Sequence, residues 1–288
     1  MVQGEGTRIR LGWPELGEAE LAEVAEVLES GMLTMGPKVA EFEAQIAAAC
    51  ETTHALAVTS GTAALHLAVL ALGLQQGDEV LVPAYTFPAT ANVVELSGFK
   101  ARLVDVDPET MNLDPSKLEV GDAKLLLGVH LFGRPLRMHE LPDLPFLEDA
   151  AGALGARYRG RACGGLGVAG CLSFHPRKIV TTGEGGAVTT SDDEVAATMR
   201  EFRNHGWRSL NPADMPAAGL NYRLSDILCA VGIPQMTRLD ELLATRTRIA
   251  DGYSERLAHL PVTLPRADDG DVHGWQAYVI QLDDRDRV

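Results

Sequence analysis

The chain has 288 residues, 46% hydrophobic and 23% charged, which is typical of a soluble globular protein with a substantial core and excludes a disordered chain. Its 25 Lys and Arg against 40 Asp and Glu give a formal net charge of −15, which disfavours nucleic-acid or anionic-membrane binding because phosphate recognition relies on a basic field. No signal peptide and no apolar run of about 18 residues is visible, so we expect a cytoplasmic protein that does not contact the membrane. Four scattered cysteines and eight scattered histidines predict reduced, mostly buried thiols and no metal site.

The first two predicted elements are helices. Apolar residues recur at helical spacing over residues 18–29, and Pro37 opens a second helix that runs to about residue 49. From residue 54 short apolar runs alternate with helices such as the one that ends at Gly73 and the one over 89–96. Strands are expected at 55–58, 79–82, 102–106, 125–129, 145–149, 170–174 and 186–190. These runs lack period-2 alternation, so the sequence predicts a doubly wound α/β fold with about seven mostly parallel strands and helices on both faces.

After residue 191 the pattern is mainly helical. Helices are expected at 193–202, 225–232 and 234–260, and strands of a smaller C-terminal α+β unit at 262–264 and 277–280. The predicted organisation is a large domain over residues 1–233 and a small domain over 234–288. The small domain looks incomplete at Val288.

Lys178 lies just beyond the predicted strand at 170–174, after Pro176 and among small, hydroxylated and glycine residues. In open α/β sheets, ligands bind at the carboxyl ends of the strands, so this position suits a nucleophilic amine. From spacing alone, a solvated lysine in a turn is the alternative interpretation, since most lysines are solvated.

Three other segments have local features that complement this amine. Ser60-Gly61-Thr62 lies between a strand and a helix start, where free N–H groups bind a phosphate or where a serine simply caps the helix. Asp149 ends an apolar strand, so it either caps the next segment or needs a cation such as a protonated pyridine. Phe87 is either a core aromatic or a cover for a flat cofactor. Together these groups match the requirements of pyridoxal 5′-phosphate (PLP).

The chain resembles the DegT/DnrJ/EryC1/StrS family, the fold-type I, PLP-dependent sugar aminotransferases, in collinear order from about Leu11 to Tyr278. The resemblance is carried by Gly36-Pro37 with Phe42-Glu43, the runs 60–68, 77–80 and 83–92, Val104-Asp105-Val106-Asp107, His130-Leu131-Phe132-Gly133, Glu148-Asp149-Ala150-Ala151, the runs 173–178 and 183–186, Arg203-Asn204-His205-Gly206 and Leu220-Asn221-Tyr222-Arg223.

The resemblance implies a role for each matching position. Lys178 would bond covalently to the cofactor aldehyde and serve as general acid and base, Asp149 would keep the pyridine nitrogen protonated, and Phe87 would pack on the ring. The phosphate would be bound by three small residues through backbone N–H groups and hydroxyls, namely Gly61, Thr62 and Ser173. Asn221 would reach the phosphate of the neighbouring subunit's cofactor, which implies a homodimer with shared active sites.

The resemblance also implies the reaction, in which glutamate donates an amino group to a nucleotide-linked keto-sugar. Four cationic residues are candidates for binding the diphosphate, or are ordinary solvated charges: Arg203, His205, Arg208 and Arg223. A pyridoxamine-phosphate-dependent sugar dehydratase is a less favoured alternative, because that branch has histidine in place of Lys178. A noncatalytic binding protein of the same fold is the other alternative.

Two features depart from the family pattern. Many members have Gln or His three residues after the aspartate, whereas this chain has Gly152, so we expect different packing around the cofactor ring. Family members also continue well beyond the segment 272–278, and a chain that ends at Val288 is expected to lack part of the small domain.

Overall fold

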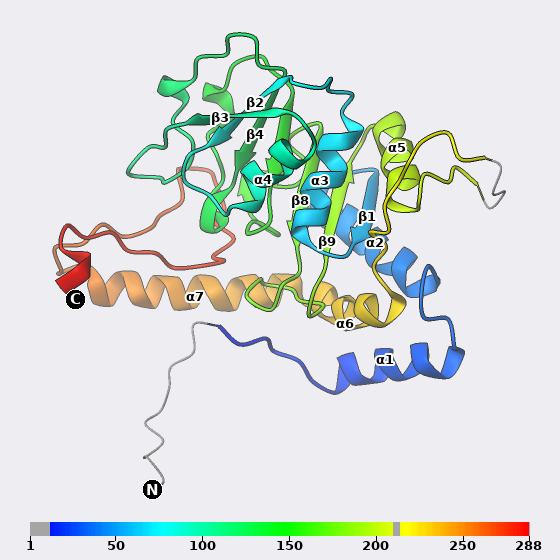
Figure 1. Ribbon diagram of the computed structural model, residues 1–288. Coiled ribbons are helices and arrows are strands. Elements are labelled where there is room, and N and C mark those ends of the chain that lie inside the picture. The colour runs from blue at the N-terminus through cyan, green and yellow to red at the C-terminus, as the bar shows by residue number, and fades with distance from the viewer. Residues whose placement is uncertain (1–11, 210–213, 288) are drawn as a thin grey trace, which may run out of the picture.

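The computed structural model describes residues 12–209 and 214–287, and within these ranges the chain forms a seven-stranded central sheet (Figure 1). The strands are β1 (His54–Val58), β2 (Glu79–Pro83), β3 (Lys100–Val104), β4 (Leu125–Val129), β5 (Phe146–Asp149), β8 (Ala169–Ser173) and β9 (Gly186–Thr190). Their order is β1-β9-β8-β5-β4-β2-β3. Strands β3, β2, β4, β5 and β8 are parallel, and β9 runs antiparallel to both of its neighbours. The predicted mostly parallel sheet is confirmed.

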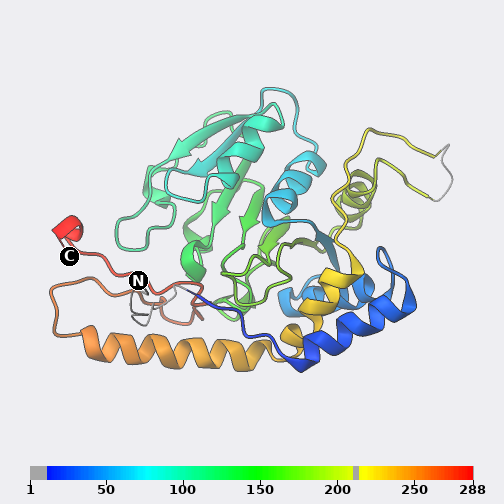
Figure 2. The ribbon, with the colours of Figure 1, turned by 60° about the horizontal axis from the view of Figure 1, so that its bottom comes forward.

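Helices cover both faces of this sheet, as the alternation of short strands and helices predicts. They are α1 (Glu18–Ser30), α2 (Pro37–Cys50), α3 (Gly61–Ala71), α4 (Ala89–Leu96), α5 (Asp193–Arg203), α6 (Asp226–Thr237) and α7 (Leu239–Leu257). Helices α3, α4 and α5 contribute to one buried cluster, and α2 and α6 contribute to the cluster on the other face. Figures 1 and 2 both show α7 extending along one side of the molecule, beneath the sheet.

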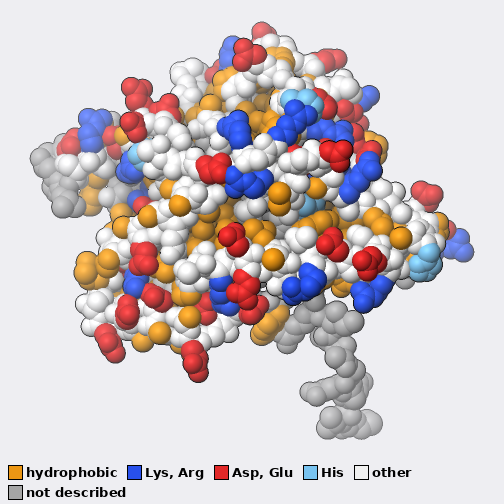
Figure 3. Space-filling model, turned by 180° about the vertical axis from the view of Figure 1, so that it is seen from behind, with side chains coloured by type: hydrophobic (Ala, Val, Ile, Leu, Met, Phe, Trp, Pro, Cys, Tyr) orange, Lys and Arg blue, Asp and Glu red, His pale blue; other side chains and the backbone are white. Residues whose placement is uncertain are grey.

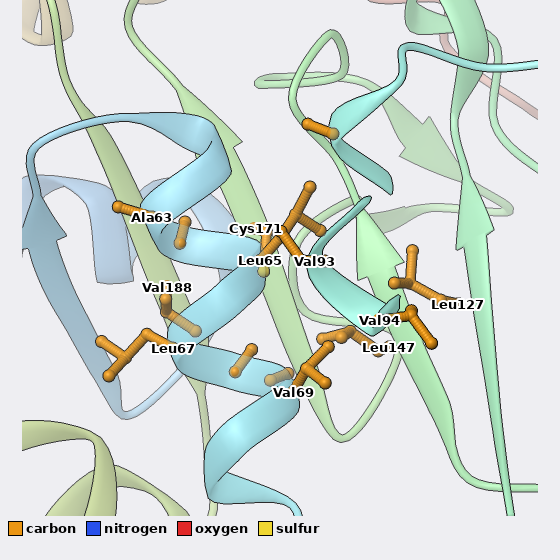
Figure 4. Close-up of a cluster of buried hydrophobic side chains, with 14 of the residues drawn as sticks. Ala63, Leu65, Leu67, Val69, Val93, Val94, Leu127, Leu147, Cys171 and Val188 are labelled. Atoms are coloured by element: carbon orange, nitrogen blue, oxygen red, sulfur yellow. The ribbon is translucent and has the colours of Figure 1, made fainter. Parts of the chain in front are cut away.

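The side chains of each strand alternate between these two faces. In β4, Leu125 and Leu127 belong to the cluster under α3 and α4, whereas Leu126 points to the opposite face. Figure 4 shows Leu127 and Leu147 of neighbouring strands beside Val94 of α4. Each such side chain is almost fully buried and contributes about 1.5–3 kcal/mol to the free energy of unfolding. Because both faces are buried, the strands read as continuous apolar runs.

The helix break predicted at residue 233 is wrong. Helix α6 continues through Pro234 to Thr237, and the chain turns at Arg238 before α7. A proline inside a helix removes one backbone hydrogen bond. The buried side chain of the next residue, Gln235, is bonded to the carbonyl of Val231 in the same helix, at 2.6 Å, and also to a neighbouring loop. The boundary predicted between large and small domains at residue 233 therefore falls inside α6.

The two strands predicted at 262–264 and 277–280 are also wrong. An isolated antiparallel bridge joins Thr263 to Gln281 through N–H···O distances of 2.8 and 3.0 Å. A pair of strands without a sheet to extend is marginally stable, and this segment finds other partners. The N–H of Gln276, for example, donates to the turn that follows β4 at 3.0 Å. The C-terminal segment is thus an extended chain between that turn and α7. Sequence patterns also missed a small hairpin, β6 (Arg157–Tyr158) and β7 (Arg161–Ala162).

The surface carries mixed charges, and the cysteines lie in the interior. The face seen in Figure 3 carries acidic and basic side chains interspersed with scattered apolar ones. Among the helices of the described ranges, none has the length and apolar content to cross a bilayer. All four cysteines are buried and unpaired, which confirms their expected burial.

Candidate active site

Lys178 lies in the hairpin loop that connects β8 to β9. The ends of the loop are held together, because the N–H of Phe174 donates to the carbonyl of Gly185 at 2.8 Å and the N–H of Thr182 donates to the carbonyl of Phe174 at 3.0 Å. Phe174 is fully buried. The amine is therefore mounted on a closed loop at the carboxyl end of β8, as the sequence predicts.

Two helices hold this loop from outside, and it lies beside them in Figure 1. From α6, the side-chain oxygen of Gln235 accepts the N–H of Thr181 at 3.0 Å, and its nitrogen donates to the Thr181 carbonyl at 2.7 Å. From α7, Arg246 donates to the carbonyl of Trp275 at 2.9 Å and to that of Lys178 at 3.5 Å. One guanidinium thus connects the lysine backbone to the C-terminal segment.

The side chain of Lys178 is partly buried. Within residues 12–209 and 214–287, no hydrogen bond or ion pair involves its Nζ atom. Burial lowers the pKa of the Lys178 ammonium, while the carboxylate of Asp149 acts in the opposite direction. A desolvated amine without a protein partner is a better nucleophile at neutral pH than a solvated lysine.

Asp149 ends β5, one strand away from the lysine, and pairs in register with Cys171 of β8. It is 4% exposed. Its Oδ1 accepts the backbone N–H of Ala151 at 3.1 Å, and its Oδ2 accepts the hydroxyl of Thr90 at 2.8 Å. Burial raises the pKa of the Asp149 carboxyl, although these hydrogen bonds and the charge of Lys178 lower it. Such a carboxylate is stabilised by a cationic partner.

The predicted phosphate site lies at the start of α3. Ser60 is the helix cap, because its Oγ accepts the N–H of Ala63 at 3.0 Å. The preceding N–H groups of Gly61 and Thr62 have no acceptor among the described residues, as expected for a helix start. A Cβ atom at Gly61 would lie 2.8 Å from Cβ of Ser173, so glycine is what lets the helix start approach the end of β8. Backbone amides and hydroxyls therefore converge there.

These groups fit PLP. The cofactor presents an aldehyde, a ring nitrogen that becomes cationic and a phosphate, and it is held in proteins by a lysine, an acidic residue and amide or hydroxyl donors. Lys178 and Asp149 satisfy the first two requirements. The start of α3 together with Ser173 supplies the third.

Phe87 lies in the turn before α4, and its ring leaves 73% of its surface exposed. Its carbonyl accepts the N–H of Thr90, the residue that bonds to Asp149. The predicted ring cover therefore lies next to the site in the chain and is not a core aromatic.

Asn221 lies beside the edge strand β1, where the carbonyl of the next residue, Tyr222, accepts the N–H of Thr59 just before the start of α3. Arg223 forms an antiparallel bridge with Val58 at the end of β1, and β1 is separated from β8 by β9. The Asn221 side chain is exposed. Among the described residues, no hydrogen bond joins Asn221 to Lys178 of the same chain.

One of the four residues predicted to bind the diphosphate, Arg203, is buried and bonded to other parts of the protein. Arg203 is 5% exposed and is paired with Glu43, and it also donates to the carbonyl of Ala57 at 3.0 Å. Its role is to fasten α5 to α2 and β1, so it is not available to a ligand. His205 and Arg208 are exposed. Arg208 is paired with Glu201 at 2.7 Å, and Arg223 donates to Asn204 at 2.6 Å.

Comparison with known proteins identifies the group to which this site belongs. The model of the DegT/DnrJ/EryC1/StrS aminotransferase family matches residues 14–288. The chain belongs to that family. It is a family of PLP-dependent aminotransferases, so the resemblance inferred from the sequence and the aminotransferase-like fold are both confirmed.

Three relatives illustrate the similarity. The chain is 40% identical over 287 residues to GDP-perosamine synthase of Caulobacter vibrioides, covering 96% of this chain and 77% of that protein. It is 36% identical over 305 residues to the spore coat polysaccharide biosynthesis protein SpsC of Bacillus subtilis, covering 99% and 78%. The crystal structure of S. venezuelae DesV in complex with a ketimine intermediate aligns with a TM-score of 0.88 at 37% identity, covering 93% of this chain and 75% of that one.

The glycine that departs from the pattern of the DegT/DnrJ/EryC1/StrS family has a neighbour from the C-terminal segment. A Cβ atom at Gly152 would lie 3.5 Å from Cβ, Cγ and Oε1 of Gln276. This is ordinary van der Waals contact, so the side chain of Gln276 packs on Gly152. The space beside Gly152 is therefore occupied by Gln276, a residue far along the sequence.

Sequence reasoning missed the residues that orient the site of this family member. Thr90 bonds to Asp149, Gln235 bonds to the lysine loop and Arg246 bonds to the lysine itself. A polar side chain on an otherwise apolar helix, as Gln235 is, was the available signal. Among the described residues no cluster of His, Cys, Asp or Glu is arranged to hold a metal.

Proposed function

We propose that this protein transfers an amino group from glutamate to a nucleotide-linked keto-sugar, with PLP as cofactor, in polysaccharide or amino-sugar biosynthesis. The observation that carries the proposal is the unpaired, partly buried amine of Lys178 beside the buried carboxylate of Asp149, at the ends of neighbouring strands. Similarity to a GDP-perosamine synthase and to a spore coat polysaccharide biosynthesis protein supports the substrate class.

Each predicted site residue has a place in this proposal. When bound, PLP supplies an aldehyde that joins to an amine and a ring that withdraws electrons from it. Lys178 holds the aldehyde, Asp149 pairs with the ring nitrogen and Phe87 covers the ring. The phosphate is bound by the N–H groups and hydroxyls at one corner of the site, those of Gly61, Thr62 and Ser173.

The proton transfers are assigned to Lys178. With PLP bound, the Nζ atom of Lys178 would be the group that takes a proton from the α-carbon of glutamate and later returns one. Burial favours the neutral form of the amine that this step requires. Arg246 and Gln235 keep the lysine backbone in place, because each bonds to the loop that carries it.

We also propose a homodimer in which Asn221 of one subunit reaches the phosphate of the cofactor in the other. The exposed Asn221 side chain supports this, as does an apolar surface around α1. That surface consists of the exposed residues Leu16, Leu21, Leu28, Met32, Leu33 and Met35. A second copy of the chain would remove it from water.

The function is tested by combining spectroscopy with assays. The purified protein with PLP should show a visible absorbance band, and borohydride should fix the cofactor on the peptide that contains Lys178. Amino transfer from glutamate is then measured on a panel of nucleotide-linked keto-sugars. Lys178→Ala should abolish the visible band and the amino transfer. Lys117→Ala, at an exposed position, should retain the band and the transfer. Full amino transfer by Lys178→Ala would refute the role of the lysine.

The same assays separate the alternatives. A dehydratase would release a product that has lost oxygen without gaining nitrogen, which mass spectrometry distinguishes. A noncatalytic member would bind ligands of the panel without converting any of them. Lys178 disfavours the dehydratase, and the presence of an unpaired amine near the buried carboxylate of Asp149 disfavours a noncatalytic protein.

The shared site is tested by complementation. If Lys178 and Asn221 act across subunits, a mixed dimer of Lys178→Ala and Asn221→Ala chains contains one intact site. Refolding an equal mixture should recover about one quarter of the native activity, from random pairing of two inactive chains. If the mixture forms mixed dimers but recovers no activity, the active site is not shared between subunits.

A further inference from the structure

Two threonine hydroxyls form a chain that ends on Asp149. Thr90, in the first turn of α4, is fully buried, and its hydroxyl donates to Oδ2 of Asp149 at 2.8 Å. The hydroxyl of Thr86 lies 2.8 Å from that of Thr90. Thr86 is partly exposed, so the chain leads from solvent to the buried carboxylate.

The direction of these hydrogen bonds follows from the number of protons. An ionised carboxylate only accepts, so the single hydroxyl hydrogen of Thr90 points to Asp149. The oxygen of Thr90 must then accept from Thr86. Both hydroxyls therefore point toward the carboxylate, and hydrogen bonds aligned in this way strengthen one another.

The remaining surroundings of Asp149 supply little compensation. The N–H of Ala151 donates to Oδ1. The charged or titratable groups that face the carboxyl are Lys178 from the β8–β9 loop, His130 from the end of β4 and Cys171 from β8. His130 is already bonded to a different carboxylate, that of the buried Glu148, at 2.9 Å. Thr90 is thus a major donor to a carboxylate that burial pushes toward its neutral form.

We infer that Thr90, oriented by Thr86, is a positioning residue that keeps Asp149 ionised and fixes the plane of its carboxylate for the ring nitrogen of PLP. The use of this carboxylate rests on the proposed function. A helix cap is not the explanation, because the hydroxyl of Thr90 bonds to two side chains and not to the backbone of its own helix.

The first experiment needs no cofactor. The Asp149 carboxyl binds its proton more tightly in the folded chain than in the unfolded one, so stability falls as pH rises from the unfolded value of 3.8 through the folded pKa. Thr90→Val removes a hydrogen-bond donor to Asp149, so the pKa of the carboxyl rises further and the free energy of unfolding falls over a wider pH range. We expect its urea midpoint, relative to the native chain, to drop more at pH 8 than at pH 5, and Thr90→Ser to restore it.

The matched control is Thr190→Val. Thr190 is equally buried, and its hydroxyl donates to the carbonyl of Val168 at 2.8 Å, in β9, two strands away from the strand that carries Asp149. This variant should lose the same stability at both pH values. If Thr90→Val showed the same pH-independent loss, the hydroxyl would be merely structural and the inference would fail.

The second experiment uses the PLP-loaded protein. A cationic ring nitrogen disfavours a second positive charge on the nitrogen of Lys178, so losing the ionised Asp149 should move the pH midpoint of the visible band upward. For Thr90→Val we expect a shift of about one unit and about tenfold weaker PLP binding. Thr86→Ala, at a partly exposed position that folding tolerates, should cause a smaller shift in the same direction.

The two experiments fail separately. If the native chain binds no PLP, the proposed function is wrong, while the urea experiment still decides whether Thr90 controls Asp149. If the native chain binds PLP and neither the spectral midpoint nor the pH dependence of stability changes in Thr90→Val, the inference about Thr90 is wrong and the proposed function stands.

Discussion

Gln235 of α6 makes two hydrogen bonds to a single residue, Thr181, accepting its N–H at 3.0 Å and donating to its carbonyl at 2.7 Å. Thr181 and Gln235 are both 2% exposed, so water cannot replace either bond. The pair locks the loop of Lys178 onto a helix 54 residues further along the chain.

Replacing this glutamine should therefore weaken both folding and the site. Gln235→Leu leaves the N–H and the carbonyl of Thr181 buried without partners, which should cost about 2–4 kcal/mol in urea unfolding. PLP binding should weaken as well, because the loop of Lys178 loses its anchor. Gln75→Leu, at an exposed position, is the control and should change the free energy of unfolding by less than about 0.5 kcal/mol. Equal losses in the two variants would contradict the assignment.

Two glycines near the site should respond differently to alanine. At Gly61 the new Cβ would lie 2.8 Å from Cβ of Ser173, so helix α3 must move away from β8. Gly61→Ala should therefore reduce PLP affinity at least about tenfold, and overpacking should cost about 1–3 kcal/mol. At Gly152 the nearest atoms, those of Gln276, lie at 3.5 Å. Gly152→Ala should fold normally and keep its PLP affinity, and a PLP titration of both variants tests the contrast.

The C-terminal segment should be sensitive to acid through Asp268. Hydrogen bonds from Arg137 and Arg134 lower the pKa of this carboxyl from 3.8 to about 2. Because the pKa is lowered in the folded chain, the ionised Asp268 carboxylate stabilises the folded state by about 2 kcal/mol. This stabilisation is present above pH 4 and is lost as pH falls through about 2. Asp268→Asn should remove this stabilisation at pH 7, whereas Asp269→Asn, at the exposed neighbouring position, should retain it. Hydrogen exchange of the segment at pH 7 is the measurement, and identical exchange in both variants would be the contrary result.

Arg246 should control the order of two segments at once. Arg246→Gln removes the bonds to the carbonyls of Lys178 and Trp275, so amides in both segments should exchange faster. The loss should be about 1–3 kcal/mol in local opening free energy, since these bonds involve a charged donor. Arg248→Gln, two residues away and exposed, should leave exchange unchanged. Faster exchange at Trp275 without any change near Lys178 would show that the longer contact, at 3.5 Å, has no effect.

Local patterns predicted the sheet well, and they singled out Lys178 and Asp149 as candidate site residues. Every strand of the sheet coincides with a predicted run within two residues, and in the inner strands burial on both faces makes the apolar run continuous, whereas the edge strand β3 is partly exposed. Lys178 and Asp149 were recognisable because strand ends are where open α/β sheets bind ligands. These inferences use only neighbouring residues and a general rule about sheets.

The errors arose where distant contacts decide the outcome. Pro234 reads as a helix boundary, but α6 continues through it to Thr237 while Gln235 bonds to Thr181, 54 residues earlier. Arg203 reads as a free cation, but it is buried against Glu43, 160 residues earlier. The role of Thr90 becomes visible only when β5 places Asp149 beside it. No spacing within the sequence reports such contacts.

The cap of α2 has a consequence for synthesis of the chain. The N–H groups of Gly36 and Lys38, at the start of α2, are bonded to the carboxylate of Asp226, which lies 190 residues beyond Gly36. Strand β1 likewise pairs with β9, which is translated much later. A nascent chain therefore emerges from the ribosome with an uncapped helix and an unpaired strand edge, which is a state prone to aggregation. The N-terminal quarter of the chain therefore reaches its final structure only after residues 186–226 have been made.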